Sequence, residues 1–173
     1  MAFFRIKKIK GKEYAYVVEN EWKAGSSRQR VKDYLGRVFR LDLKNDIDFK
    51  RFIKTDSIKN YIDGNGSSKI INDLLEWELF RFNVDKGIFS IDLIGKKIQK
   101  NERNVALLIN EGFLCSLTLR GLFEFKPGEE NTDAYLFARA FVEAGVKVPQ
   151  EVFVGLFGKL HKNIEKRKSD FTW

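Results

Sequence analysis

Three basic side chains alternate along one predicted strand: Arg28, Arg30 and Lys32. Residues two apart in a strand project to the same face and lie about 6.6 Å apart, which is near two steps of one nucleic-acid strand, at roughly 3.4 Å each. Arg5 and Lys7 alternate in the same way in the first predicted strand. We therefore expect all of these cations to share one exposed face of an antiparallel sheet and to contact the phosphates of a nucleic acid.

Aromatic rings are interleaved with these cations. Tyr14, Tyr16, Trp22 and Tyr34 all lie within the same basic segment. Exposed rings stack on unpaired bases, which favours RNA or single-stranded DNA, whereas rings that pack the sheet onto the helices contribute only to the core. The predicted nucleic-acid-binding residues are Arg5, Lys7, Lys10, Lys12, Arg28, Arg30, Lys32, Tyr34 and Arg37.

The distribution of charge supports a polyanionic partner. The chain has 32 Lys and Arg against 24 Asp and Glu residues, a net charge of +8, and residues 1–40 hold 11 basic and 4 acidic residues, a net charge of +7. Residues 41–94 carry a net charge of −2 and residues 95–173 a net charge of +3. A concentrated basic segment attracts nucleic acid more often than an anionic membrane. The alternative is that the charge only keeps the surface solvated.

Side chains suited to catalysis are few. Glu124-Phe-Lys126 has the acidic-x-Lys form of one class of metal-dependent nuclease, and Asp92 on a preceding strand is its candidate partner. The three aspartates within residues 42–48 are close in sequence, but they stand where helix caps and loops are expected. We therefore expect no catalytic residues, no metal site and no cofactor.

The single cysteine, Cys115, excludes an internal disulfide, and the single histidine, His161, excludes a multi-histidine metal site. No apolar run approaches the roughly 18 residues of a membrane-spanning helix, and charged residues interrupt residues 1–8, where a signal peptide would be apolar. These features predict a soluble, cytoplasmic protein with no membrane partner.

Apolar and polar residues alternate from Phe3 to Leu41, which predicts a three-stranded antiparallel meander. Turns are expected at Gly11-Lys12 and within residues 23–27. Gly36 should break or bulge the third strand.

The rest of the chain is predicted to be mainly helical. Apolar residues at helical spacing indicate a helix over about 68–82, and residues 88–109 resemble a second small antiparallel sheet. The predicted C-terminal helices are one from Asn110 or Glu111 to Phe125, one from Thr132 to Gly145 and one that follows Pro149. The expected fold class is therefore α+β: a basic β-meander over residues 1–42, then an α+β body over residues 43–173 with a central helix, a second small sheet and a C-terminal helical bundle, all over one shared core.

The stretch from Phe4 to Asn20, FRIKKIKGKEYAYVVEN, and the stretch from Arg28 to Arg37, RQRVKDYLGR, resemble the N-terminal region of a family of insertion-sequence (DDE-type) transposases, a region shared with stand-alone archaeal proteins. The resemblance covers about 40 of the 173 residues. It implies a DNA-holding role for Lys7, Lys10, Lys12, Arg28, Arg30, Lys32 and Arg37. The remainder of the chain does not resemble the acidic-triad catalytic core of those enzymes, so we do not expect transposition.

The sequence thus predicts a non-catalytic protein that binds DNA or structured RNA through its basic meander. Two alternatives are a ribosome-associated RNA-binding factor and a small metal-dependent nuclease. A third is a protein-interaction module whose basic face meets an acidic partner. Trp77 and Phe80 lie off the apolar stripe of the central helix and mark a candidate surface for a protein partner on the helical part.

Overall fold

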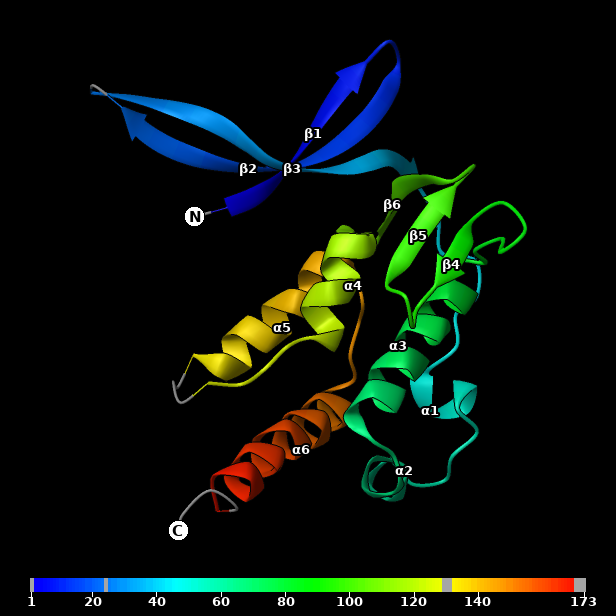
Figure 1. The fold of residues 1–173 in the computed structure, drawn as a ribbon. Coiled ribbons are helices and arrows are strands. Elements are labelled where there is room, and N and C mark those ends of the chain that lie inside the picture. Colours follow the sequence, from blue (N-terminus) through cyan, green and yellow to red (C-terminus); the bar gives the residue numbers. More distant parts are fainter. Residues whose placement is uncertain (1, 24, 129–131, 170–173) are drawn as a thin grey trace.

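The computed structural model describes residues 2–23, 25–128 and 132–169 (Figure 1). Its strands are β1 (Ala2–Ile9), β2 (Lys12–Lys23), β3 (Ser26–Arg40), β4 (Ser90–Asp92), β5 (Lys97–Lys100), β6 (Arg103–Ile109) and β7 (Gly112–Leu114). Its helices are α1 (Phe49–Phe52), α2 (Ile58–Gly64), α3 (Ser67–Arg81), α4 (Ser116–Phe123), α5 (Asp133–Ala144) and α6 (Gln150–Ser169). The α+β class and the N-terminal meander are confirmed.

The meander consists of two hairpins that share β2. The β1–β2 turn lies at Lys10 and Gly11, both with positive φ (48° and 75°), and the β2–β3 turn contains Gly25 with a φ of 77°. The β1–β2 and β2–β3 hairpins extend in different directions (Figure 1). Lys10 therefore lies at a hairpin tip and not within a strand.

One sheet replaces the predicted pair of sheets. The strands β4, β5 and β6 are antiparallel neighbours, as expected, but β6 also pairs in parallel with the end of β3, with Arg37 opposite Val105 and Arg40 opposite Leu108. The strand order is β1-β2-β3-β6-β5-β4, and β7 pairs with β6. Because β3 and β6 are about 60 residues apart in the chain, the local alternation on which the sequence prediction rests does not reveal this junction.

The predicted helix starting at Asn110 or Glu111 is wrong, because these residues form the turn between β6 and β7, with φ values of 43° and 66°. A short apolar run does not distinguish a strand from a helix by periodicity. The Asn110 side chain fixes the turn by donating hydrogen bonds to the buried carboxylate of Glu78 on α3 (3.0 Å) and to the carbonyl of Gly145 (2.9 Å). The helix α4 begins only at Ser116.

The other long helices lie where they were predicted. The helix α3 covers nearly the predicted range, and α5 ends at Gly145, whose φ of 69° forms the expected left-handed cap. The helix α4 packs on α5, whereas α6 packs on α2 and α3 (Figure 1). No helix in the described ranges has the length and apolar character needed to cross a bilayer.

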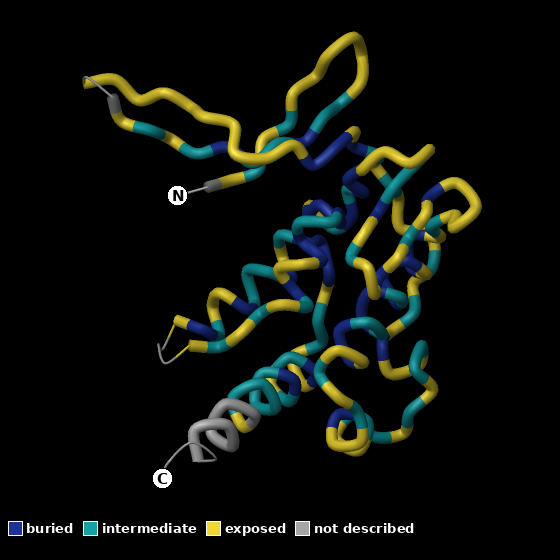
Figure 2. The backbone as a smooth tube through the Cα atoms, viewed as in Figure 1, coloured by how far each residue is buried: buried dark blue, intermediate teal, exposed yellow. Residues whose placement is uncertain are grey.

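The largest apolar cluster lies between these helices and the sheet, where the buried segments gather in Figure 2. It includes fully buried residues of α3, β6 and α5 such as Leu74, Leu107 and Phe137. A smaller cluster of Ala15, Leu35, Val38, Ala106, Phe113 and Cys115 lies where the meander meets β6 and β7. The meander is thus attached to the body through both strand pairing and apolar contacts.

Candidate functional site

The strand register divides the side chains of the meander between two faces, because residues directly opposite in paired strands project to the same side. Arg5 lies opposite Tyr16, which lies opposite Tyr34. Lys7 lies opposite Tyr14, which in turn lies opposite Arg37. The tyrosine face, as we call it, consists of Arg5, Lys7, Lys12, Tyr14, Tyr16, Tyr34 and Arg37.

The opposite face carries ion pairs. Arg28 lies opposite Glu21 and Arg30 opposite Glu19. Arg30 bonds to Glu21 (3.1 Å) and Lys32 to Glu19 (2.7 Å). This ion-pair face therefore contains compensated charges, and the expectation that Arg28, Arg30 and Lys32 lie on one face with Arg5 and Lys7 is wrong.

Two bulges in β3 explain the difference. The register shifts between the pairs Val18–Val31 and Val17–Asp33, so Lys32 is an extra residue, and it shifts again around Leu35. One extra residue reverses which side chains face a given side of the sheet. The first bulge moves Arg28 and Arg30 away from the tyrosine face. The second bulge brings Arg37 onto it, beside Tyr34.

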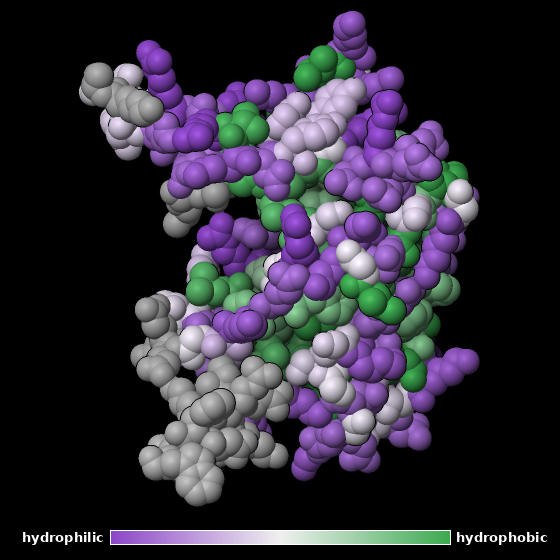
Figure 3. Space-filling model, in the orientation of Figure 1, coloured by the Kyte–Doolittle hydropathy of each residue, from purple (hydrophilic) through white to green (hydrophobic). Residues whose placement is uncertain are grey.

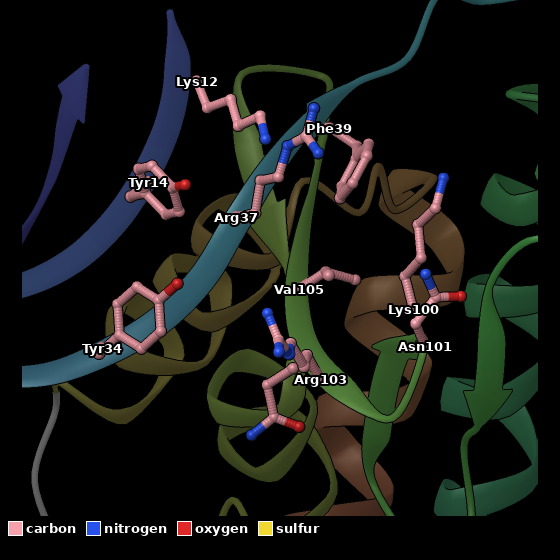
Figure 4. A pocket seen from close by; sticks show the side chains of 10 residues that line it. Lys12, Tyr14, Tyr34, Arg37, Phe39, Lys100, Asn101, Arg103 and Val105 are labelled. Carbon is pink, nitrogen blue, oxygen red and sulfur yellow. The ribbon is translucent and has the colours of Figure 1, made fainter. Parts of the chain in front are cut away.

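A hollow of about 460 Å³ lies where the tyrosine face meets the turn between β5 and β6 (Figure 4). We call it the basic hollow. Its lining residues are Lys12, Tyr14, Tyr34, Arg37, Phe39, Lys100, Asn101, Arg103, Asn104 and Val105. Lys12, Tyr34 and Arg37 were predicted as binding residues, whereas Lys100 and Arg103 were missed. Only the β3–β6 junction brings Lys100 and Arg103 to the site, and their local sequence does not mark them as binding residues.

Aromatic contacts hold two of the cations in place. The guanidinium carbon of Arg37 lies 4.8 Å from the centre of the Phe39 ring, and the ammonium of Lys100 lies 4.9 Å from the same centre. Phe89 packs edge-on against Phe39 at 5.2 Å between ring centres and lies 5.3 Å from the Lys100 ammonium. Cation–π contacts of this kind position a charge without neutralising it.

The positive charge of the basic hollow is uncompensated. Its lining contains four cations, Lys12, Arg37, Lys100 and Arg103, and no carboxylate. Across the described part of the chain, ten other basic side chains, those of Arg30, Lys32, Arg40, Arg51, Lys69, Arg81, Lys86, Lys96, Arg139 and His161, lie within 4.0 Å of a carboxylate, but none of these four does. Four like charges around one concavity repel one another, and this repulsion is relieved by a bound anion.

Tyr14 and Tyr34 form the aromatic wall of the hollow, and Tyr16 packs against Tyr34 on the adjoining tyrosine face. The Tyr34 ring centre lies 5.2 Å from that of Tyr16 and 6.4 Å from that of Tyr14, and Tyr34 remains 50% exposed. Burial, followed by the neighbouring Tyr16 and Tyr14 hydroxyls, raises the pKa of Tyr34. Its hydroxyl therefore remains a neutral hydrogen-bond donor at neutral pH and adds no negative charge. The ammonium of Lys7 lies 5.2 Å from the Tyr16 ring centre, which extends the cation and ring pattern along the sheet.

Side chains over the N-terminal strands and the adjoining β5–β6 region are mainly hydrophilic in Figure 3. Arg5, on the tyrosine face, donates a hydrogen bond to Gln29, which pairs with Asn20 farther along the β2–β3 hairpin. This polar surface leads away from the basic hollow along the sheet, so a long polyanion bound in the hollow can also contact Arg5 and Lys7.

The candidate nuclease residues have local structural partners. The Asp92 carboxylate accepts a hydrogen bond from the Gly95 amide (2.8 Å), and Glu124 pairs with Lys96 (2.7 Å), whose hydrogen bond lowers the pKa of Glu124. Of the predicted acidic cluster, Asp48 caps α1. Within the described ranges no three His, Cys, Asp or Glu side chains form a group able to hold a metal ion.

The remaining reactive side chains are also engaged. Cys115 is buried beside the Thr118 hydroxyl (3.7 Å), and burial raises the pKa of its thiol, which keeps it in the unreactive protonated form. His161 faces the buried Asp133 at 4.0 Å. Trp77 is only 6% exposed and donates to the Ile47 carbonyl (2.9 Å), so its predicted place on a docking surface is wrong.

No protein-family model, curated protein or solved structure matches this chain. The transposase resemblance of the N-terminal segment therefore stays a prediction, and the function has to be inferred from the geometry of the site.

Proposed function

We propose that this protein binds nucleic acid, without cleaving it, through the basic hollow and the adjoining tyrosine face. The observation that carries the proposal is the group of four cations around a partly exposed tyrosine cluster with no carboxylate in the lining. Phosphates supply the missing negative charge, and arginine forks such as those of Arg37 and Arg103 suit their geometry.

Nucleic acid fits the site better than the other common polyanions. An anionic membrane presents a broad, flat surface and is bound by clustered cations with apolar anchors, whereas the basic hollow is concave and lined by tyrosines. An acidic peptide would pair with the cations, but its carboxylates provide no flat ring to stack on the exposed Tyr34. Nucleic acid offers both phosphates and bases.

Within this proposal, the ligand is DNA or structured RNA in the cytoplasm, and a ribosome-associated RNA is one form of it. The transposase resemblance of the N-terminal segment favours DNA. A protein partner on the helical part stays a separate prediction. With Trp77 buried, the half-exposed Phe80 on α3 is the remaining candidate contact residue for that partner.

Two matched double variants test the proposal. Arg37→Gln with Arg103→Gln removes two uncompensated charges from the basic hollow, and Arg30→Gln with Lys32→Gln removes two charges from the ion-pair face. Both variants lose the same net charge from exposed positions. If each phosphate contact contributes about 1–2 kcal/mol as a charge-assisted hydrogen bond, the first pair lowers affinity by about 30- to 1,000-fold.

The second pair is expected to lower affinity only a few-fold, through the general loss of positive potential. Fluorescence anisotropy of a labelled oligonucleotide measures both affinities, and thermal unfolding confirms that both variants fold. Equal losses for the two pairs would show that only net charge matters and would remove the basic hollow as the binding site.

A further inference from the structure

We infer that the basic hollow takes an unpaired base stacked on Tyr34, so that the preferred ligand is single-stranded nucleic acid. This inference rests on the proposed function and specifies its ligand class. It follows from the shape of the hollow, from the exposed ring within it and from the spacing between that ring and the cations.

The shape of the site excludes a rigid double helix from its interior. A volume of about 460 Å³ lies in the range of small-ligand pockets, which is roughly 300–1,000 Å³. The backbone and grooves of a duplex are convex ridges and wide channels that are read by projecting helices or ribbons. The cations of this site line a concavity, so a duplex can touch only its rim, whereas a single nucleotide can enter.

The exposed tyrosine ring supplies a stacking surface. Tyr34 is 50% exposed and rests against Tyr16 at 5.2 Å between ring centres, so its ring is supported from behind. In Figure 4 the hydroxyls of Tyr14, on β2, and Tyr34, on β3, both point toward Arg37. Stacking on a supported ring is tolerant of base identity because every base has a flat π face.

The strand register places a cation beside the stacking ring. Tyr14 and Arg37 are direct cross-strand partners, and Tyr34 lies one step along β3 from that pair because of the bulge at Leu35. Consecutive same-face positions along one strand, such as Tyr34 and Arg37 on β3, lie about 6.6 Å apart, so the phosphate of a nucleotide whose base covers Tyr34 can reach Arg37. Arg103, whose charge acts on the Tyr34 hydroxyl, also lines the hollow and supplies a second cation for the phosphates.

Three ligands of one length test the inference with the unmodified protein: a single strand, the same strand with consecutive abasic positions, and its duplex. The abasic strand keeps every phosphate and lacks only the bases. The intact single strand should bind about 5- to 150-fold more tightly than the abasic strand, which is the range for one base–aromatic stack, and more tightly than the duplex. Single strands of DNA and RNA with the same sequence then identify the preferred sugar.

A tyrosine variant locates the stack. Tyr34→Ala should lose the preference for the intact strand over the abasic one, whereas Tyr34→Phe, which keeps the ring, should retain it. Tyr135→Ala is the matched control, because Tyr135 is 67% exposed on α5 and does not line the basic hollow. A single strand containing 2-aminopurine adds a direct signal, since stacking on the ring quenches its fluorescence.

The outcomes separate this inference from the proposed function. The stacking inference is overturned, and phosphate binding is left intact, if duplex, abasic and intact strands bind equally and in a salt-dependent way. The same conclusion follows if Tyr34→Ala behaves like Tyr135→Ala. If none of the three ligands binds in a salt-dependent way, the proposed function fails as well. The comparison of strands on the unmodified protein decides the question even if Tyr34→Ala does not fold.

Discussion

Replacing Gly36 by alanine should damage both the stability of the protein and the geometry of the basic hollow. Gly36 has a φ of 111° and lies where β3 meets β6. A Cβ atom at this position would lie 2.6 Å from the carbonyl carbon of Asn104 and 2.8 Å from the Cα of Val105, both of them backbone atoms. The backbone cannot rotate aside as a flexible side chain can, so the two strands must separate.

Two effects set the size of the loss. A non-glycine residue held at such a positive φ costs about 1–3 kcal/mol. Separation of the strands by about 1 Å weakens the adjacent parallel pairing of β3 with β6, at about 1 kcal/mol for each lost hydrogen bond. With two bonds lost, we expect the free energy of unfolding to fall by about 3–5 kcal/mol. Because the same junction brings Arg103 to Arg37, affinity for nucleic acid should also fall in the variant molecules that remain folded.

Urea unfolding followed by circular dichroism measures the change in stability, and Gly121→Ala is the matched control. Gly121 lies within α4 with no atom in the way of a Cβ, so alanine there should be neutral or stabilise the helix by up to about 1 kcal/mol. A Gly36→Ala variant within about 0.5 kcal/mol of the unmodified protein would refute the close β3–β6 approach and, with it, the assembly of the basic hollow.

Three further predictions concern the rest of the molecule. Burial and the hydrogen bond to Asp73 (2.7 Å) raise the pKa of Tyr61. The stability that the protonated Tyr61 contributes is therefore present below the ordinary tyrosine pKa of about 10 and is lost as the pH rises above it. Urea titrations should show a lower free energy of unfolding at pH 11 than at pH 8, with a smaller decrease in Tyr61→Phe. Trp77→Phe should cost about 1–3 kcal/mol, because the Ile47 carbonyl loses its donor; an unchanged unfolding curve would contradict the buried position. With magnesium or manganese, DNA and RNA should stay uncut; cleavage abolished by Glu124→Gln would instead support the nuclease alternative.

The parts of the fold that were predictable are those set by local pattern. The apolar spacing of Ile70, Leu74 and Leu75 specifies α3, because the helix period alone places these side chains on the core. Gly145 ends α5 because a left-handed cap favours glycine. Likewise, the meander follows from alternation and from turn residues. None of these features depends on a distant contact.

The candidate site was predictable only in part, because it depends on register and on long-range pairing. Alternation alone places Arg28 and Arg30 beside Tyr34, but one inserted residue, Lys32, reverses that arrangement. Arg37 was predicted, although its place beside Tyr34 depends on the second bulge. Arg103 and Lys100 have no local signal for binding, because a parallel pairing brings them to the site.

The dependence of affinity on salt tests most directly whether the basic hollow is an electrostatic phosphate site. Four cations that each neutralise one phosphate give a slope of log affinity against log salt between about −2.8 for a single strand and about −3.6 for a duplex. A fourfold increase in salt concentration should therefore weaken binding by about 50- to 150-fold. Affinity that does not change with salt would contradict phosphate recognition by Lys12, Arg37, Lys100 and Arg103 and would leave their shared hollow without a nucleic-acid ligand.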